Sequence, residues 1–251
     1  MNEAPAAQLI ELFSSVQGEG PLVGMRQAFL RFAGCNLQCS YCDTQLAIQP
    51  NCLIEATPGH GDLRPTPNPV ALETVLAVLQ RWNRNSPGLH QALSITGGEP
   101  LLAVDTLVEW LPVLKQQLPI LLETNGTLPA ALARVRPWLS YVSMDIKLPS
   151  TSGLPAQWEV HREFLQASAG VETYVKVVVG ATTSDGEVEQ SAQLIRSVDS
   201  TIPLILQPQS PSAAQSATMT ALRLLDLQAL ASRILSQVRI IPQTHKFIGV
   251  L

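Results

Sequence analysis

The sequence predicts an α/β fold that forms a partial, incomplete TIM-like barrel of about six parallel βα units. Short apolar segments alternate with segments whose apolar residues recur at helical intervals, and each short segment ends in Gly, Pro or polar residues. About six such units follow residue 42, which is too few for a closed barrel of eight. In folds of this kind ligands bind at the carboxyl ends of the strands, so we expect the functional residues there.

The elements follow from these patterns in chain order. Residues 11–20 form a short apolar start that runs into a turn punctuated by glycines, and the first strand covers 27–34. The helices are expected at 70–82, 105–117, 129–135, 156–167, 185–196 and 217–237. The strands between and after them are expected at 92–96, 120–124, 140–147, 173–179, 204–207 and 238–241.

A segment rich in proline interrupts this order between residues 45 and 69. Proline lacks a backbone N–H, so dense prolines disfavour both helix interiors and hydrogen-bonded strands. We therefore expect a loop insertion at about 45–69, at the surface or as a lid, within a single domain that spans residues 1–251. Cys52 lies in this segment and is expected to be a small apolar residue of a surface loop.

Composition excludes several classes of partner. The chain is 46% hydrophobic and 14% charged, as in a well-packed enzyme, and its net charge is −4 without any Lys/Arg-rich run. It therefore lacks the basic surface that nucleic-acid binding needs. No apolar run approaches the ~18 residues of a membrane span, and no secretory signal precedes Ile10. Cysteines grouped at metal-binding spacing favour the reducing cytoplasm.

Three of the four cysteines, Cys35, Cys39 and Cys42, lie in a CxxxCxxC pattern within residues 34–44, which we call the cysteine loop. Structural zinc usually takes four protein ligands, so three cysteines are one too few. A 4Fe–4S cluster has four irons, and three cysteines would leave one iron open for chemistry. A zinc site that uses Cys52 as the fourth ligand remains an alternative at this point.

Polar residues at several strand ends are the other candidates for a site. They occur in 96–99, 123–125, 143–147 and 207–210, and the barrel would bring them together beside the cysteine loop. The pair Gly97-Gly98 lets the backbone approach a ligand closely, and Glu99 offers an acceptor for a ligand ammonium group. An isolated charge at any one of these positions would more simply be a solvated surface group.

The cysteine pattern followed by Gly97-Gly98-Glu99-Pro100 resembles the radical S-adenosylmethionine superfamily. The resemblance implies that S-adenosylmethionine chelates the open iron through its amino and carboxylate groups. It also implies that the Gly-Gly-Glu-Pro stretch binds the methionine amino group. Residues 1–251 would then form one radical S-adenosylmethionine domain.

Three further stretches resemble the 7-carboxy-7-deazaguanine synthase family of the queuosine pathway: Phe13 to Gly20, the cysteine loop, and Pro242 to Phe247. This resemblance implies a carbon–nitrogen lyase that contracts the ring of 6-carboxy-5,6,7,8-tetrahydropterin with loss of ammonia. The reduced cluster would cleave S-adenosylmethionine to a radical that takes a hydrogen atom from the pterin. The alternatives are another enzyme of the superfamily, such as a glycyl-radical activase, or a zinc-stabilised binding module.

The same resemblance implies roles for individual residues, although no side chain is assigned as a catalyst in its own right. The cluster ligands would be Cys35, Cys39 and Cys42, and Thr44 would bind Mg2+. The residues around S-adenosylmethionine would be Tyr41, Cys42, Asp43, Gly98, Glu99, Ser143, Lys147, Gln207, Pro208, Gln209 and Ser210. Those around the pterin would be Val16, Gln17, Gly18, Arg31, Thr96 and Leu251, with Arg31 on its carboxylate. The implied partners are an electron donor such as flavodoxin or ferredoxin and a second copy in a homodimer.

Overall fold

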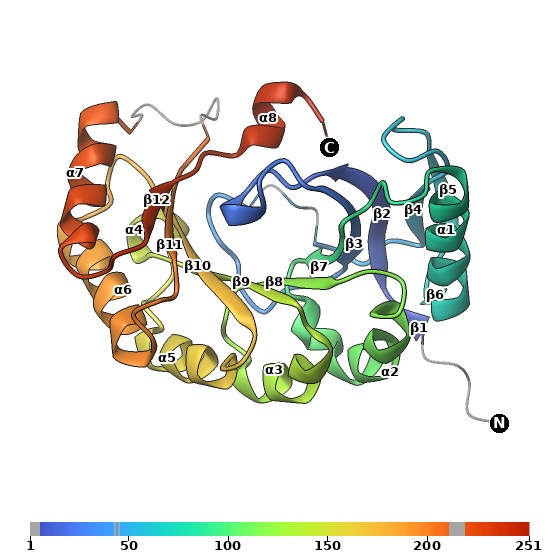
Figure 1. The fold of residues 1–251 in the computed structure, drawn as a ribbon, viewed down its shortest axis with the longest axis horizontal. Helices are drawn as coiled ribbons and strands as arrows, with labels where there is room; N and C mark the ends of the chain where they lie inside the picture. Colours follow the sequence, from blue (N-terminus) through green and yellow to red (C-terminus); the bar gives the residue numbers. More distant parts are fainter. Residues whose placement is uncertain (1–5, 43, 45, 211–218, 251) are drawn as a thin grey trace.

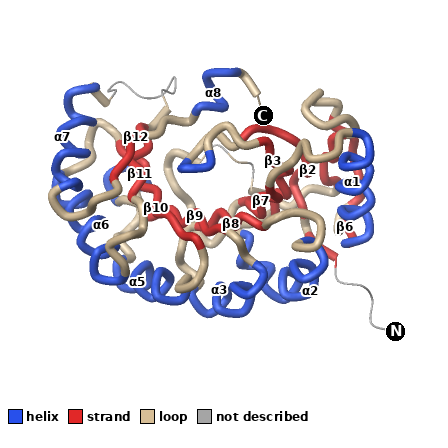
Figure 2. Tube along the Cα trace, viewed as in Figure 1, coloured by secondary structure: helices blue, strands red, loops and turns tan. Residues whose placement is uncertain are grey.

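The computed structural model describes residues 6–42, 44, 46–210 and 219–250 and contains one large curved sheet with helices on its outer side (Figure 1). The sheet has ten strands in the order β12-β11-β10-β9-β8-β7-β3-β2-β4-β5, and a separate pair joins β1 (Ala6–Ala7) to β6 (Val70–Ala71). Figure 2 shows the strands on the inner curve and most helices in an outer ring. The sheet is open, because β12 and β5 are its two edges.

Six consecutive strands of the sheet are parallel neighbours, which confirms the incomplete barrel of about six βα units. They are β7 (Ala92–Gly97), β8 (Ile120–Thr124), β9 (Tyr141–Ile146), β10 (Glu172–Val179), β11 (Leu204–Pro208) and β12 (Val238–Ile240). The strand before the cysteine loop, β3 (Arg26–Phe32), pairs in parallel with β7. The cysteine loop therefore starts at the carboxyl edge of the parallel strands.

The helices lie close to the predicted spans. The longer ones are α1 (Leu72–Asn85), α2 (Val104–Leu114), α5 (Trp158–Ala167), α6 (Asp185–Val198) and α7 (Ala221–Ser232); the shorter ones are α3 (Pro129–Val135), α4 (Pro149–Ser152), α8 (Thr244–Ile248) and the 3-10 turns η1 (Gly20–Leu22), η2 (Pro100–Ala103) and η3 (Arg136–Trp138). The predicted helix 217–237 is shorter at both ends than expected, and it starts at Ala221 because the Thr220 side chain accepts a bond from the Arg223 N–H and caps α7. Residues 217–218 lie outside the described part of the chain.

The prediction of a loop without strands at about 45–69 is wrong. This segment holds β4 (Asn51–Glu55) and β5 (Leu63–Pro67), which pair as an antiparallel hairpin at one edge of the sheet. Pro65 and Pro67 are tolerated because β5 is the edge strand and does not need every N–H for pairing. Cys52 is completely buried in β4 and does not lie in a surface loop. Gln45, at the start of the predicted insertion, is outside the described residues.

The apolar start of the chain is a further strand, β2 (Leu9–Val16), which pairs antiparallel with β3 and parallel with β4. The sheet is therefore mixed, although its barrel portion is parallel. The segment that follows β2 lies within the curve of the strands, where η1 sits in Figure 1. A Cβ atom on Gly20 would lie 2.5 Å from the ring of Tyr174, so η1 packs closely on β10.

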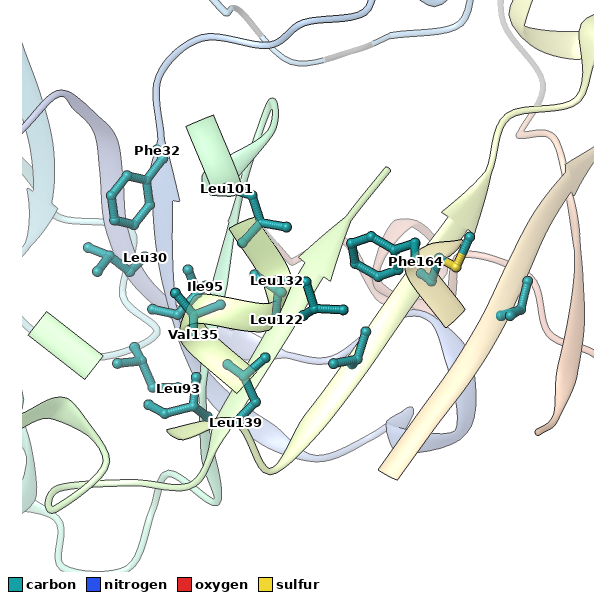
Figure 3. Packing of buried hydrophobic residues seen from close by; sticks show 14 of the residues in the cluster. Leu30, Phe32, Leu93, Ile95, Leu101, Leu122, Leu132, Val135, Leu139 and Phe164 are labelled. Atoms are coloured by element: carbon teal, nitrogen blue, oxygen red, sulfur yellow. The ribbon is translucent and has the colours of Figure 1, made fainter. Parts of the chain in front are cut away.

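The core lies between the sheet and the outer helices. In Figure 3, Leu93 and Ile95 of β7 and Leu122 of β8 lie near Leu132 and Val135 of α3. Each such leucine contributes about 1.5–3 kcal/mol by burial. The alternate residues of the parallel strands point to the inner side, and several of them are polar, namely Ser94 and Thr96 of β7, Lys176 of β10 and Gln207 of β11. In the part of the chain that the structure describes, no helix is long and apolar enough to span a membrane.

Candidate active site

A cavity of about 640 Å³ lies on the inner side of the barrel, between the cysteine loop and the carboxyl ends of β7 to β11. A second cavity of about 160 Å³ is lined by the end of β2 and by the residues that follow it. The two cavities share a set of lining residues: Glu19, Arg31, Thr44, Thr96, Glu123 and Gln243. They therefore adjoin, and the cysteine loop and the segment after β2 face a common space.

The cysteine loop holds its three thiols at the wall of the larger cavity. Cys35 and Cys39 are half-buried and Cys42 is exposed. Ser40 anchors the loop to the end of α4, since its N–H donates to the carbonyl of Ser152 at 2.9 Å and its hydroxyl to that of Thr151 at 2.7 Å. Burial raises the pKa of the Cys35 and Cys39 thiols, so a metal must displace their protons to bind.

The glycine pair after β7 meets the cysteine loop directly. A Cβ atom on Gly98 would lie 2.2 Å from the carbonyl oxygen of Gly34 and 2.7 Å from Cβ of Cys35. No side chain fits there, so Gly98 allows the two backbones to approach closely. The Glu99 N–H donates to the same Gly34 carbonyl at 2.9 Å. The two sequence motifs are thus brought together in space.

The Glu99 carboxylate does not face the cavity, in contrast to the expected contact with a ligand ammonium group. It is completely buried and accepts hydrogen bonds from the N–H of Leu101 at 3.0 Å, the hydroxyl of Thr124 at 2.9 Å and the N–H of Asn125 at 2.8 Å. Its lone pairs are therefore used to hold the ends of β7 and β8 together. Pro208 at the end of β11 is also absent from the described cavity walls.

Four charged side chains form a row across the larger cavity. Lys147 Nζ donates to Asp145 Oδ2 at 2.8 Å, and Lys176 Nζ is 3.5 Å from the same oxygen and pairs with Glu19. Burial alone would lower the pKa of both lysines, but the neighbouring carboxylates outweigh it and raise the pKa of each. Both lysines therefore remain charged, and the row alternates in sign.

Glu19 contacts two strands, β10 and β11, and the segment after β12. Its carboxylate accepts from Gln207 of β11 at 3.2 Å and from Gln243 after β12 at 2.7 Å, in addition to Lys176 of β10. Burial raises the pKa of this carboxyl, but Lys176 and Gln243 outweigh burial and lower it to about 2. Glu19 is therefore ionised at neutral pH.

The residues predicted to contact the substrate gather at the smaller cavity. Val16, Gln17, Gly18, Arg31 and Thr96 all line it. The Gln17 amide donates to Glu123 Oε1 at 3.0 Å and the Thr96 hydroxyl to Glu123 Oε2 at 3.4 Å. A side chain on Gly18 would collide with His245, whose Nδ1 would lie 1.9 Å from the added Cβ.

Arg31 lies at the boundary of the two cavities. Its Nε donates to Glu11 Oε1 at 2.7 Å, and its guanidinium lies 5.8 Å from the centre of the Phe13 ring. No hydrogen bond from its two terminal nitrogens is found to any residue in the described ranges. Those nitrogens can therefore donate to an anion in the cavity.

Most of the other residues predicted to surround S-adenosylmethionine line the larger cavity. Those that line it are Tyr41, Thr44, Ser143, Lys147, Gln207, Gln209 and Ser210. Lys147 Nζ lies 5.2 Å from the centre of the Tyr41 ring, and the Ser210 hydroxyl donates to Gln243. Asp43 and Leu251 lie outside the described residues.

Sequence reasoning missed several residues of this site. Glu19, Glu123, Asp145, Lys176 and Gln243 line the cavity but had no assigned role. Lys176 carried a visible signal, because it is a charged residue inside the apolar strand segment Val175–Val179. The others stood in stretches that had been noted at strand ends or in the family motifs.

The donor set suits a cluster better than a single ion. Among the described residues no group of three or more His, Cys, Asp or Glu side chains is arranged around a single metal position. In a 4Fe–4S cluster each cysteine binds a different iron, so the sulfurs need not converge on one point. Cys52 is buried in β4 away from both cavities, so a zinc site with Cys52 as the fourth ligand is not formed by this arrangement.

Comparison with known proteins agrees with this geometry. A family model described as the Radical SAM superfamily matches residues 30–195. The chain is 50% identical, over 98% of its length and 99% of the relative's, to a protein of Geobacter sulfurreducens named 7-carboxy-7-deazaguanine synthase. It is 38% identical, over 97% of its length and 98% of the relative's, to a protein of the same name from Methanothermobacter thermautotrophicus.

A solved structure shows a similar fold. The structure of QueE from Escherichia coli superposes with a TM-score of 0.57 at 19% identity, and the match covers 95% of this chain and 94% of that one. At this level of identity the likeness concerns the fold alone.

Proposed function

The chain belongs to the 7-carboxy-7-deazaguanine synthase family of the Radical SAM superfamily, and on this basis we propose which ligands each of its two cavities binds. The larger cavity takes the 4Fe–4S cluster and S-adenosylmethionine, and the smaller one takes a carboxylated tetrahydropterin. One observation carries this proposal: the cysteine loop and the pocket of Gln17, Arg31 and Glu123 border adjoining cavities. A hydrogen atom can therefore pass between the two ligands without either leaving the barrel.

The cluster would be held by Cys35, Cys39 and Cys42. When bound, the cluster and S-adenosylmethionine would provide the radical chemistry that removes a hydrogen atom from the substrate. The protein supports S-adenosylmethionine with Tyr41, Gly98, Ser143, Lys147, Gln207, Gln209 and Ser210, each of which lines the larger cavity. Two buried polar atoms there, Asp145 Oδ1 and Gln207 Oε1, have no partner among the described residues, which suits a polar ligand.

The smaller cavity matches the chemistry of a pterin acid. Its carboxylates, Glu19 and Glu123, can accept from the N–H groups of an aminopyrimidinone ring, and Gln17 and Thr96 hold Glu123 in place. Arg31 offers terminal nitrogens that can bind both oxygens of the substrate carboxylate. Charge and hydrogen-bond pattern therefore orient the ring before hydrogen transfer.

Thr44 is assigned to Mg2+ in this proposal. It lines both cavities, as Arg31 does, so its hydroxyl could share a magnesium ion with the substrate carboxylate. Mg2+ prefers hard oxygen ligands of this kind. With a carboxylated tetrahydropterin bound, the reaction would be a carbon–nitrogen lyase step that releases ammonia.

Two features of the surface support the expected partners. An electron donor such as flavodoxin or ferredoxin would approach the cysteine loop, where Cys42 is exposed. The end of α8 exposes Phe247 and Ile248 by 81% and 61%, and such an apolar surface suits a second copy in a homodimer. The four cysteines, all within the described residues, form no disulfide, and cysteines kept reduced for a cluster suit a reducing compartment, which supports a cytoplasmic enzyme.

Anaerobic reconstitution with iron and sulfide tests this function. The protein should take up a cluster with iron–sulfur absorption and cleave S-adenosylmethionine in the presence of a strong reductant. Retention of zinc without a cluster would contradict it.

A further inference from the structure

Asn125 directly follows β8 and contacts the cysteine loop. Its Nδ2 atom donates to Asn36 Oδ1 at 2.9 Å and lies 3.9 Å from the sulfur of Cys35, within hydrogen-bond range for sulfur. The Leu37 N–H approaches the same sulfur at 3.4 Å. Cys35 thus has one backbone donor and one side-chain donor.

The orientation of the Asn125 amide is fixed by its neighbours. Its Oδ1 accepts from the Thr127 N–H at 3.1 Å and from the Thr127 hydroxyl at 2.6 Å. A backbone N–H can only donate, so the oxygen must face Thr127 and the NH2 group must face Cys35. The Asn36 amide donates to the Thr127 hydroxyl at 2.8 Å, which closes a ring of three side chains.

The backbone of Asn125 is held as firmly as its side chain. Its N–H donates to Glu99 at 2.8 Å, and its carbonyl accepts from Nε2 of His161 at 3.2 Å. Burial lowers the pKa of His161 to about 4, so the ring is neutral and donates from that nitrogen. Asn125 is 4% exposed, so water does not compete for these bonds. This network gives the buried Glu99 carboxylate its structural role.

We infer that Asn125 is a positioning residue that sets the reduction potential of the cluster through its N–H donation to Cys35. The inference rests on the proposed role of Cys35 as a cluster ligand. Reduction adds negative charge to the cluster and its sulfurs, and a donor stabilises the reduced form more than the oxidised form. Asn125 therefore raises the potential and makes the cluster easier for a modest electron donor to reduce.

The test is a redox titration of the reconstituted protein, followed by electron paramagnetic resonance. Asn125→Ala should lower the equilibrium constant for reduction of the cluster by at least tenfold. For one electron this is a shift of the midpoint potential by about 59 mV in the negative direction. Asn36→Ala is the matched control, because it removes the other partner of the same amide and leaves Thr127 to orient Asn125. Its reduction equilibrium should stay within twofold of wild type.

Iron content separates this inference from the proposed function. A full cluster with unchanged potential in Asn125→Ala would overturn the role of Asn125 and leave the cluster assignment intact, whereas a wild-type chain that binds no cluster would overturn the function itself. If Asn125→Ala fails to fold, the same redox titration is carried out on Asn125→Leu, because leucine fills a similar volume without a hydrogen-bond donor. A wild-type potential in that variant would equally overturn the inference.

Discussion

Lys176 pairs with Glu19, a residue 157 positions earlier in the chain, and also lies 3.5 Å from Asp145. Lys176 is in the middle of β10, and Glu19 lies directly before η1. The contact therefore ties the segment after β2 across the inner side of the barrel. It also places a carboxylate of fixed charge beside the proposed substrate pocket.

Replacement of Lys176 by methionine should destabilise the protein strongly. It leaves Glu19 and Asp145 as buried carboxylates without their shared cation, which costs about 3 kcal/mol or more. Urea unfolding measures this loss, and Lys176→Arg should recover part of it. Lys115→Met is the control, because Lys115 is exposed and its removal should change stability by less than about 0.5 kcal/mol. Equal stability of the Lys176→Met and Lys115→Met proteins would show that the pair contributes nothing.

Glu19 should make the stability depend on pH in the acid range. Its folded-state pKa of about 2 is below the ordinary value of 4.5, so its contribution is fully present above pH 4.5 and is lost as the pH falls toward 2. Glu19→Gln should therefore be less stable than wild type at pH 7, and the difference should shrink at pH 3.5. Urea unfolding of both proteins at the two pH values measures this, and a difference that is independent of pH would refute the assignment.

Arg31 should govern substrate affinity through the shape of its side chain. Arg31→Ala should raise KM for the pterin by about 10–100-fold, the range expected for loss of a charge-assisted bond, while cluster absorbance stays unchanged. Arg31→Lys keeps the charge but lacks the planar fork, so its recovery should be partial. Normal pterin binding by Arg31→Lys would rule out two-point recognition of the carboxylate.

The two kinds of cysteine should respond differently to substitution. Cys39→Ser should lose both iron and activity, whereas Cys52→Ala should keep both, because Cys52 is buried in β4. Cys52→Ser should also keep its iron but lose about 1–3 kcal/mol of stability, since it buries a hydroxyl. Iron analysis and thermal unfolding check these outcomes, and loss of the cluster in Cys52→Ala would make Cys52 a ligand after all.

The parts of the fold that depend on local sequence pattern were predictable. Hydrophobic periodicity and turn residues are properties of a few neighbouring positions, so β7 to β11 and the helices α2, α3, α5 and α6 were found within a few residues of their ends. The short helix α4 between β9 and β10 was not predicted. The cysteine loop and Gly97-Gly98 were found in the same way. Their meeting at the carboxyl edge followed from parallel pairing with β3.

The parts that depend on neighbours distant in sequence were not predictable. A proline such as Pro65 predicts the end of a strand. Pro65 is tolerated within β5 only because β5 is the edge strand of the sheet. The motif around Glu99 predicts a carboxylate that binds a ligand. In the structure this carboxylate instead accepts hydrogen bonds from the N–H of Asn125 and the hydroxyl of Thr124 in the protein interior. The pair of Glu19 and Lys176 depends on how the segment after β2 folds back, which no local pattern records.

The most direct measurement is anaerobic turnover of 6-carboxy-5,6,7,8-tetrahydropterin by the reconstituted protein with S-adenosylmethionine, a strong reductant and Mg2+. Product and ammonia are followed by mass spectrometry and by an enzymatic ammonia assay, with Cys39→Ser as the inactive control. The account predicts equal amounts of 7-carboxy-7-deazaguanine and ammonia from wild type and neither from the control. A protein with a complete cluster that cleaves S-adenosylmethionine but leaves the pterin unchanged would contradict it.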